Sequence, residues 1–415
     1  MSKYAEIISI GDEILYGQTL DTNSHWISGR LDEIGIKVRR KITIGDEREE
    51  ILNCLKESSE RSDIILITGG LGPTRDDLTK PLLAEYFGVG LKMNNEAFEH
   101  IRTLFEKRGR EVTELNRMQA ELPENCIKID NRLGTAPGMW FEEKGTVYVS
   151  MPGVPYEMEA MMNDIILPKL KEKFTGGVIY HKIVKTVGIG ESALAEKITD
   201  WEDHLPKSIK LAYLPTFGQV KLRLTALGSD KAVLEKQVGQ EVDKLIPQIA
   251  SYVYGYDSDE LEKVVGDILL KNNKSIAFAE SCTGGYISHL MTKVPGSSKY
   301  YKGSIVSYDY DVKVNSLDVD RKVMEEKGAV SEEVVLQMAR SVRSKLRADV
   351  GISVSGIAGP GGGTEGKPVG TVWIGYSDEQ KTIAKKFNFS KDRNVNIKLS
   401  ALCALNMFRI NFLGN

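Results

Sequence analysis

The sequence is poor in cysteine and histidine, and it has no long apolar run. Its 415 residues include four cysteines and five histidines, with no spacing typical of a metal site. The scattered cysteines predict no disulfide framework, so we expect a reducing, cytoplasmic setting. No apolar stretch approaches the ~20 residues that a membrane span needs. The first residues, Met-Ser-Lys-Tyr-Ala-Glu, lack the pattern of a secretory signal, and we expect no membrane partner.

Excess positive charge is also absent. The chain carries 55 Lys and Arg against 58 Asp and Glu, for a formal net charge of -3. A nucleic-acid partner is therefore not expected, because such proteins usually present a basic surface. Hydrophobic content of 41% is typical of a globular protein, and the length predicts two or three domains.

A short apolar run near residue 280 ends in a serine and two glycines. Residues 276–280 predict a buried strand that ends before Ser281, with a turn at Gly284 and Gly285 and a helix next. A serine at such a strand end, beside backbone N–H groups, suits a nucleophile with an oxyanion hole. The structural alternative is that Ser281 is the N-cap of the next helix, a position that serine often occupies.

Two more strand ends carry polar residues. One β-type run ends at Tyr308, shortly before Lys313, and another ends at Ser355, before a loop with five glycines. The carboxyl ends of parallel strands share one edge of a sheet, which predicts a crevice there. A lysine whose pKa is lowered can act as general base for a serine, and a tyrosine can pass the proton on. The alternatives are an edge aromatic for Tyr308 and a solvated lysine for Lys313.

These blocks resemble the CinA C-terminal domain, the nicotinamide mononucleotide deamidase family, also called nicotinamide-nucleotide amidohydrolase. The similar segments are 280–285, 308–313, 356–362 and 367–372. The resemblance implies a hydrolase without a cofactor, in which Ser281 is the nucleophile and Lys313 and Tyr308 assist. Tyr310 stands where the family commonly has asparagine. A rival interpretation makes Cys282 the nucleophile, but no histidine lies near it in sequence.

The expected substrate contacts follow the same blocks. Amides around residues 283–285 are expected to hold the oxyanion, and the glycine loop at 359–363 with Arg393 to hold the substrate phosphate. The predicted contact residues are Cys282, Thr283, Gly284, Gly285, Ser355, Gly356, Gly359, Gly361, Gly362 and Arg393.

The N-terminal part alternates strands and helices. Strand-type runs at 5–10, 36–44 and 63–68 are separated by helical patterns at 23–35 and 48–59. This order predicts a parallel sheet with right-handed crossovers. The last strand ends in a glycine loop whose amides can cradle a phosphate. Asp76 and Asp77, expected at the following helix start, could hold a divalent metal or simply complement the helix dipole.

Segments 11–15, 69–79, 134–138 and 151–158 resemble the molybdopterin-binding fold of the MoaB, MogA and MoeA proteins and, more closely, the CinA N-terminal domain. Some members of that family are implicated in metal-dependent ADP-ribose pyrophosphatase activity; molybdopterin handling is the fold-level alternative. The resemblance implies a site with a divalent metal on Asp76 and Asp77. Its expected residues are Asp12, Glu13, Asn23, Gly69, Gly70, Gly72, Thr74, Asp76, Asp77 and Thr79.

Between these parts, the order β-α-β-β-α resembles the KH-type middle domain of CinA. The nearest counterpart of a Gly-x-x-Gly loop, at 188–191, ends in an acid, so we expect a spacer or dimer element. We therefore predict an α/β protein of three domains: a MoaB/MogA-like three-layer domain (1–170), a small KH-like α+β domain (171–254) and an α/β deamidase domain (255–415).

The predicted protein is a homodimer that hydrolyses nicotinamide mononucleotide and, in its first domain, ADP-ribose. A non-catalytic role in DNA uptake or repair, suggested by the family's competence and damage-inducible name, is the alternative from another class.

Overall fold

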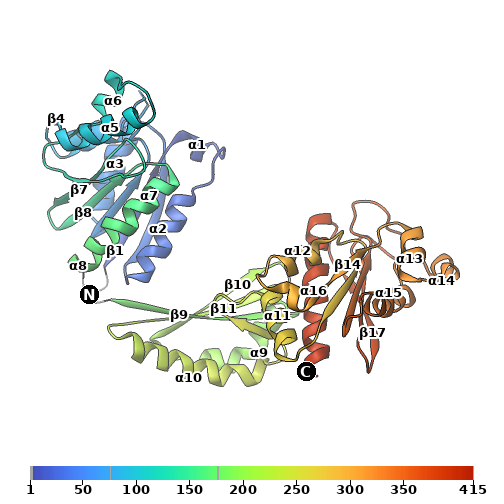
Figure 1. The fold of residues 1–415 in the computed structure, drawn as a ribbon. Coiled ribbons are helices and arrows are strands. Elements are labelled where there is room, and N and C mark those ends of the chain that lie inside the picture. The colour runs from blue at the N-terminus through green and yellow to red at the C-terminus, as the bar shows by residue number, and fades with distance from the viewer. Residues whose placement is uncertain (1–2, 75, 175–176, 415) are drawn as a thin grey trace. The chain divides into compact units, whose positions relative to one another are not determined.

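The computed structural model describes residues 3–74, 76–174 and 177–414. They divide into two units, the first of residues up to 180 with 227–234, and the second of 181–226 with 235 onward. Figure 1 shows the elements of each.

The first unit contains a six-stranded mixed sheet with the order β2-β1-β3-β8-β7-β6. The predicted parallel arrangement is present in its first four strands, whereas β7 and β6 run antiparallel. The change of direction comes from a tight hairpin at Lys144 and Gly145, which both have positive φ, as a two-residue turn requires. The strands are β1 (Tyr4–Ile10), β2 (Lys37–Ile44), β3 (Ile64–Thr68), β6 (Ile127–Ile129), β7 (Gly138–Glu143) and β8 (Thr146–Met151).

Helices cover both faces of this sheet, which gives three layers. Apolar residues of α2 (Thr22–Glu33), α7 (Pro155–Met161) and α8 (Leu167–Lys173) pack on one face. Those of α3 (Arg48–Ser59) and α4 (Thr79–Tyr86) pack on the other. The remaining elements are α1 (Asp12–Leu15), β4 (Leu91–Met93), α5 (Asn95–Lys107), α6 (Glu114–Met118), β5 (Glu121–Pro123) and a π-helical turn at Met162–Ile166.

The middle part forms a four-stranded sheet with the order β10-β11-β9-β12. Its elements are β9 (Val178–Val187), α9 (Glu191–Asp203), β10 (Ile209–Thr216), β11 (Gln219–Gly228), α10 (Lys231–Ile249) and β12 (Val253–Tyr256). The predicted β-α-β-β-α order is present, and β12 extends it by pairing antiparallel with β9.

The C-terminal part has a five-stranded sheet with the order β14-β13-β15-β16-β17. The three strands whose ends carry the predicted site, β13 (Ile276–Glu280), β14 (Tyr301–Val306) and β15 (Val350–Gly356), are parallel neighbours. The antiparallel strands β16 (Thr371–Ser377) and β17 (Thr382–Asn388) complete the sheet. Because β13 lies between the other two parallel strands, Ser281 lies at the centre of the edge that they form.

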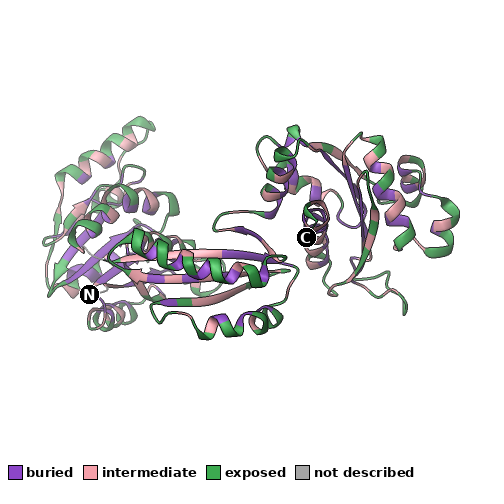
Figure 2. Ribbon diagram, turned by 90° about the horizontal axis from the view of Figure 1, so that it is seen from below, coloured by how far each residue is buried: buried purple, intermediate pink, exposed green. Residues whose placement is uncertain are grey.

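This sheet also lies between two helical layers. α11 (Leu261–Lys271), α12 (Tyr286–Thr292) and α16 (Arg393–Leu413) pack on one face. α13 (Tyr310–Leu317), α14 (Arg321–Lys327) and α15 (Glu332–Lys345) pack on the other, and a 3₁₀ turn spans Ser297–Lys299. The inner strands β13, β15 and β16 are mostly buried, whereas the edge strands β14 and β17 have no buried residue. Figure 2 shows exposed residues, in green, along the helices. Across the described ranges, none of the helices has both the length and the apolar character of a membrane span.

Candidate functional site

Ser281 follows directly after β13 and begins a tight turn. Its N–H donates to the carbonyl of Val354 at 3.0 Å, and its own carbonyl accepts from Gly284 N–H at 3.1 Å. Gly284 and Gly285 have φ values of +58° and +97°, which residues with a Cβ rarely adopt. The two glycines therefore allow the chain to reverse between β13 and α12, as the sequence predicts.

Lys313 lies next to this serine, on the first turn of α13. Its side chain is only 1% exposed, and Nζ lies 3.1 Å from Ser281 Oγ. Nζ also donates to the carbonyls of Ser307 at 2.6 Å and Tyr308 at 3.2 Å. Burial lowers the pKa of Lys313, although the negative charge of Asp309 opposes that effect. The structure thus brings the predicted serine and lysine into contact, and the lysine is not a solvated surface residue.

Tyr308 lies just beyond β14, not within it, and is 61% exposed. Its hydroxyl oxygen lies 2.9 Å from Arg393 Nη2, while Arg393 Nη1 donates to the carbonyl of Gly359 at 2.7 Å. Arg393 begins α16, whose N-cap Asp392 accepts from Val395 N–H at 2.8 Å. Tyr308, Arg393 and the glycine loop therefore form one connected group, and the tyrosine contacts Lys313 through its backbone carbonyl.

The glycines of the 356–363 loop differ in their surroundings. A Cβ at Gly356 would lie 2.5 Å from Val372, and one at Gly359 would lie 2.6 Å from Val369. Gly362 has φ +84°, whereas a Cβ at Gly361 would meet no atom within 4 Å. Gly356 and Gly359 are thus required by packing, and Gly361 lies where a ligand could approach.

Two residues predicted to contact the substrate, Cys282 and Ser355, have their side chains buried in the protein interior. The Cys282 side chain packs in the core cluster, and burial raises the pKa of this thiol to about 12. The thiol therefore stays protonated at neutral pH and does not fit the rival role of nucleophile. The Ser355 hydroxyl donates to the carbonyl of Ala329 at 2.8 Å and is 1% exposed. Both side chains therefore serve the local fold.

Glu280 begins the segment 280–285, and the sequence predicted no role for it. Its carboxylate is fully buried, and it accepts hydrogen bonds from six groups. The donors are Thr283 Oγ1, Gly285 N, Ile287 N, Ser288 N, Ser288 Oγ and Ser304 Oγ. The only sequence signal for this role is a charged residue at the last position of an otherwise apolar strand.

The hydrogen bonds of the turn change the expected oxyanion hole. The N–H of Gly284 donates to Ser281 and that of Gly285 donates to Glu280, so neither is free. Over residues 3–74, 76–174 and 177–414, the structure provides no acceptor for the N–H groups of Cys282 and Thr283. The N–H groups available to an oxyanion are therefore those of residues 282 and 283, nearer to Ser281 than the expected 283–285.

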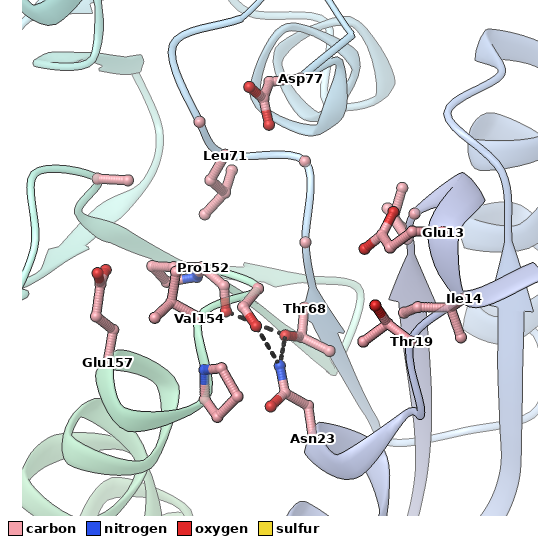
Figure 3. Close-up of a pocket in the computed structure, with 18 of the residues that line it drawn as sticks. Glu13, Ile14, Thr19, Asn23, Thr68, Leu71, Asp77, Pro152, Val154 and Glu157 are labelled. Carbon is pink, nitrogen blue, oxygen red and sulfur yellow. Dashed lines mark hydrogen bonds between the residues drawn. The ribbon is translucent and has the colours of Figure 1, made fainter. Parts of the chain in front are cut away.

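The first unit has a cavity of about 460 Å³ at the carboxyl edge of its parallel strands. Glu13, Asp77 and Glu157 surround it in Figure 3, and Asn23 donates to Thr68 at 2.9 Å beneath it. Seven predicted residues line this cavity, while Asp12, Thr74 and Thr79 are not in its lining. The seven are Glu13, Asn23, Gly69, Gly70, Gly72, Asp76 and Asp77.

The two aspartates proposed for metal binding precede the helix instead of starting it. α4 begins at Thr79, with Leu78 as its N-cap and no acid in its first turn, so the predicted placement of Asp76 and Asp77 at the helix start is wrong. Asp77 Oδ2 accepts from the N–H of Thr74 at 2.8 Å and from its hydroxyl. Thr79 instead supports the glycine loop, because its hydroxyl donates to the carbonyl of Gly69 at 3.0 Å.

Asp46, at the end of β2, is a lining residue that the sequence analysis missed. Burial raises its pKa, and the nearby charges of Asp12, Glu13 and Asp76 raise it further. Its position two residues after β2 was the available signal. Among the residues the structure describes, no three or more His, Cys, Asp or Glu side chains are placed to hold a metal ion. A Mg²⁺ that is bound with substrate phosphates needs only one or two carboxylates, which this cavity offers.

The fold and these sites define a three-domain α/β protein with a molybdopterin-binding-like domain, a KH-like domain and a C-terminal domain built around a Ser–Lys pair. Family models match residues 6–172 ("Probable molybdopterin binding domain"), 181–255 ("Damage-inducible protein CinA KH domain") and 258–412 ("CinA C-terminal domain").

The chain belongs to the CinA family. It is 53% identical to a CinA-like protein of Cytophaga hutchinsonii, over 98% of this chain and 97% of that protein. It is 43% identical to a CinA-like protein of Flavobacterium psychrophilum, over 99% of both. Among solved structures, a CinA protein of unknown function from Thermoplasma acidophilum is 34% identical over 41% of this chain and 98% of its own, with a TM-score of 0.37.

Proposed function

We propose that this protein is a nicotinamide-nucleotide amidohydrolase, which converts nicotinamide mononucleotide to nicotinate mononucleotide and ammonia. The carrying observation is the 3.1 Å separation of Ser281 Oγ and a lysine amine that is 1% exposed. Membership of the CinA family supports this class of reaction. The substrate is taken from the resemblance of the C-terminal part to the deamidase family.

The buried amine is suited to remove the serine proton. In neutral Lys313, two N–H groups can donate to the carbonyls of Ser307 and Tyr308, which leaves the lone pair for the Ser281 hydroxyl. The serine oxygen then attacks the carboxamide carbon, and the protonated amine returns the proton to the leaving ammonia. Water hydrolyses the resulting ester in the same way.

Arg393 is the proposed contact for the substrate phosphate. Its guanidinium is held in place, since it donates to both the Gly359 carbonyl and the Tyr308 hydroxyl. Arginine offers several N–H donors, so two such bonds leave others for an anion. The open approach at Gly361 is consistent with this placement.

Ammonia release from nicotinamide mononucleotide tests the proposal. We expect turnover by the wild type and its loss in Ser281→Ala and Lys313→Met. Ser341→Ala is the matched control: Ser341 lies on α15, and its hydroxyl donates at 3.4 Å to Asp318, the C-cap residue of α13, and not to Ser281 or Lys313. Full activity of a folded Ser281→Ala variant would exclude this mechanism.

We also propose a second activity, metal-dependent hydrolysis of ADP-ribose, in the first unit. The observation that favours it is the cavity that joins a glycine loop to several carboxylates. A divalent ion held by one or two of these carboxylates would neutralise the pyrophosphate. Gly69, Gly70 and Gly72 would place their backbone groups near the same phosphates, and Asn23 would orient the substrate.

Formation of AMP from ADP-ribose, with and without divalent metal, tests this activity. We expect it to need the metal and to fall in Asp77→Ala and Asp46→Asn. Thr74→Val is the matched control for Asp77, because it removes one hydrogen bond to that carboxylate and leaves the charge in place. Formation of AMP that is indifferent to the metal and to both aspartate variants would contradict the proposal.

A further inference from the structure

Glu280 occupies an unusual position beside the proposed nucleophile. Each of its two carboxylate oxygens accepts three hydrogen bonds. Oε2 accepts from Thr283 Oγ1 at 2.8 Å, Gly285 N at 3.0 Å and Ile287 N at 3.1 Å. Oε1 accepts from Ser288 N at 2.9 Å, Ser288 Oγ at 2.6 Å and Ser304 Oγ at 3.2 Å. A carboxylate offers about four lone-pair sites, so this one is saturated.

Five of these six donors belong to residues 283–288, which follow Ser281 in the chain. The carboxylate therefore gathers the turn and the start of α12 around the last residue of β13. No water or substrate can compete for it, since Glu280 is fully buried. A buried charge is tolerated only when it is this well paired, and removal of the charge would release several donors at once.

The same arrangement determines which amides remain unpaired. Glu280 takes the N–H groups of Gly285, Ile287 and Ser288, and the turn itself takes that of Gly284. In the described chain, the N–H groups of Cys282 and Thr283 have no acceptor, although both residues are at least 94% buried. Unpaired backbone N–H groups in buried residues are rare, and they are the usual donors of an oxyanion hole.

We propose that Glu280 is a positioning residue that fixes the turn so that the N–H groups of Cys282 and Thr283 receive the oxyanion. The proposal rests on the proposed function of Ser281. When Ser281 Oγ bonds to the acyl carbon, its proton moves to Lys313 and the carbonyl π electrons move onto oxygen. The two amides stabilise that oxygen until the C–N bond breaks and ammonia leaves with the proton. Glu280 itself touches neither the substrate nor Ser281 Oγ.

The deciding experiment is Glu280→Gln, measured with two reactions. The first is ammonia release from nicotinamide mononucleotide. The second is covalent labelling of Ser281 by a fluorophosphonate, in which the serine oxygen bonds to phosphorus and fluoride leaves. Glutamine replaces one oxygen by an NH₂ group, which cannot accept from three donors. We expect kcat and the labelling rate to fall about 100-fold, as when one oxyanion donor is removed, while KM changes less than threefold.

Two further readouts separate positioning from general destabilisation. Binding of nicotinamide mononucleotide to Ser281→Ala and to the double variant Ser281→Ala/Glu280→Gln should differ less than threefold. The pH midpoint of labelling should stay unchanged, because the hydrogen bonds of Glu280 go to the turn, to α12 and to Ser304, and not to Lys313 or Ser281 Oγ. Glu280→Asp keeps the charge and should recover part of the labelling rate.

Ser304→Ala is the matched control. It removes the one hydrogen bond to Glu280 that comes from β14, and it leaves the turn intact. We expect its rates to stay within about twofold of the wild type.

If Glu280→Gln does not fold, Thr283→Val replaces it, since this variant removes only one donor of the turn. The expected fall for Thr283→Val is about tenfold.

The outcomes are distinct for the two proposals. Absence of ammonia release by the wild type, with normal fluorophosphonate labelling, would refute the substrate but not the role of Glu280. Labelling of folded Glu280→Gln at the wild-type rate would refute that role. Equal losses of substrate binding and labelling would also refute it, because they would show a purely structural defect. If the substitute variant Thr283→Val is used, labelling at the wild-type rate has the same meaning.

Discussion

At the scale of single residues, the chemistry depends on how a lysine is buried. Lys313 is among the largest fully buried side chains of the chain, yet all the recorded acceptors of its amine are uncharged. Two carbonyls and a hydroxyl can satisfy either protonation state, whereas a carboxylate in contact would hold the amine charged. The absence of a carboxylate among these hydrogen-bond partners is thus what would allow this amine to serve as the proposed base.

The first prediction concerns pH. The base must be neutral, and burial lowers the pKa of Lys313, so the neutral fraction rises as pH increases through that lowered value. We expect kcat/KM to increase with pH and to reach its plateau below the usual lysine pKa of about 10.4. Rates from pH 5 to pH 10.5 would measure this. Lys313→Arg should be inactive throughout, because arginine stays charged. A midpoint at or above 10.4 would contradict the role of base.

The second prediction concerns Tyr310, where the family pattern has asparagine. Its ring is 51% exposed, and the centroid lies 5.9 Å from Lys313 Nζ, so an aromatic face borders the reacting pair. Aromatic pairs contribute about 0.5–1.5 kcal/mol beyond burial. Tyr310→Asn should therefore raise KM for nicotinamide mononucleotide by roughly threefold to tenfold and leave kcat nearly unchanged. Tyr310→Phe is the control, and an equal KM in all three proteins would exclude ring stacking.

At the scale of elements, the sequence was most informative where one pattern alone was sufficient. The amphipathic helix α3 has the bounds predicted from the sequence, 48–59, because a regular apolar period runs through it. The strand β13 and the turn after it were also predicted, because a short apolar run is followed closely by two glycines. Tyr308 was placed on a strand that in fact ends at Val306. Polar residues that continue an alternating pattern give no signal for the point where pairing stops.

The site was only partly predictable for a similar reason. The residue types and their order indicated Ser281, Lys313 and Arg393. The thiol of Cys282 and the hydroxyl of Ser355 could not be assigned, because their neighbours lie on distant segments. The carboxylate of Glu280 could not be assigned either, because the sequence does not show that the turn after it folds back onto this side chain. The direction in which a side chain points from a turn depends on tertiary packing, and the sequence pattern does not show that direction.

The third prediction concerns the turn between β13 and α12. Gly285 has φ +97°, and the left-handed region costs a residue with a Cβ about 1–2 kcal/mol. Gly285→Ala should lower the stability of the C-terminal part by that amount and slow the labelling of Ser281. Hydrogen exchange of β13 and α12 amides would measure the first effect. Gly361→Ala is the control, because its Cβ would meet open space at an ordinary φ. Equal exchange in both variants would show that the turn is not strained.

At the scale of the whole molecule, the three domains were recognised from motifs, whereas the sheets were recognised only in part. The parallel strands follow from alternating strand and helix patterns. The antiparallel strands β7 and β17 do not, since hairpins leave no crossover helix to signal them. The structure places the proposed hydrolytic centre in one unit and the acidic cavity in the other. Stability must therefore be measured unit by unit, because a chain of several domains does not unfold in one step.

The last prediction applies this to the first unit. Glu6 on β1 is fully buried and accepts from Ser58 at 2.8 Å, Ser62 at 3.0 Å and Arg61 at 2.8 Å. Burial alone would raise the pKa of Glu6, but these donors together outweigh it and hold the pKa below 4.5. A carboxyl whose pKa is lower in the folded state stabilises it at higher pH. That stability is lost as the pH falls from about 4.5 through the folded value.

Glu6→Gln should therefore destabilise the first unit by about 1–3 kcal/mol at pH 7, because it leaves buried donors unpaired. The difference from the wild type should shrink as the pH is lowered below 4.5. Hydrogen exchange of β1 and α3 amides measures this unit, and exchange of β13 should not change. Glu57→Gln is the matched control, since Glu57 is 66% exposed and contacts the same Arg61 at 3.4 Å. We expect it to change stability by less than about 0.5 kcal/mol. Equal effects of the two variants at pH 7 would show that the buried carboxylate does not stabilise the sheet.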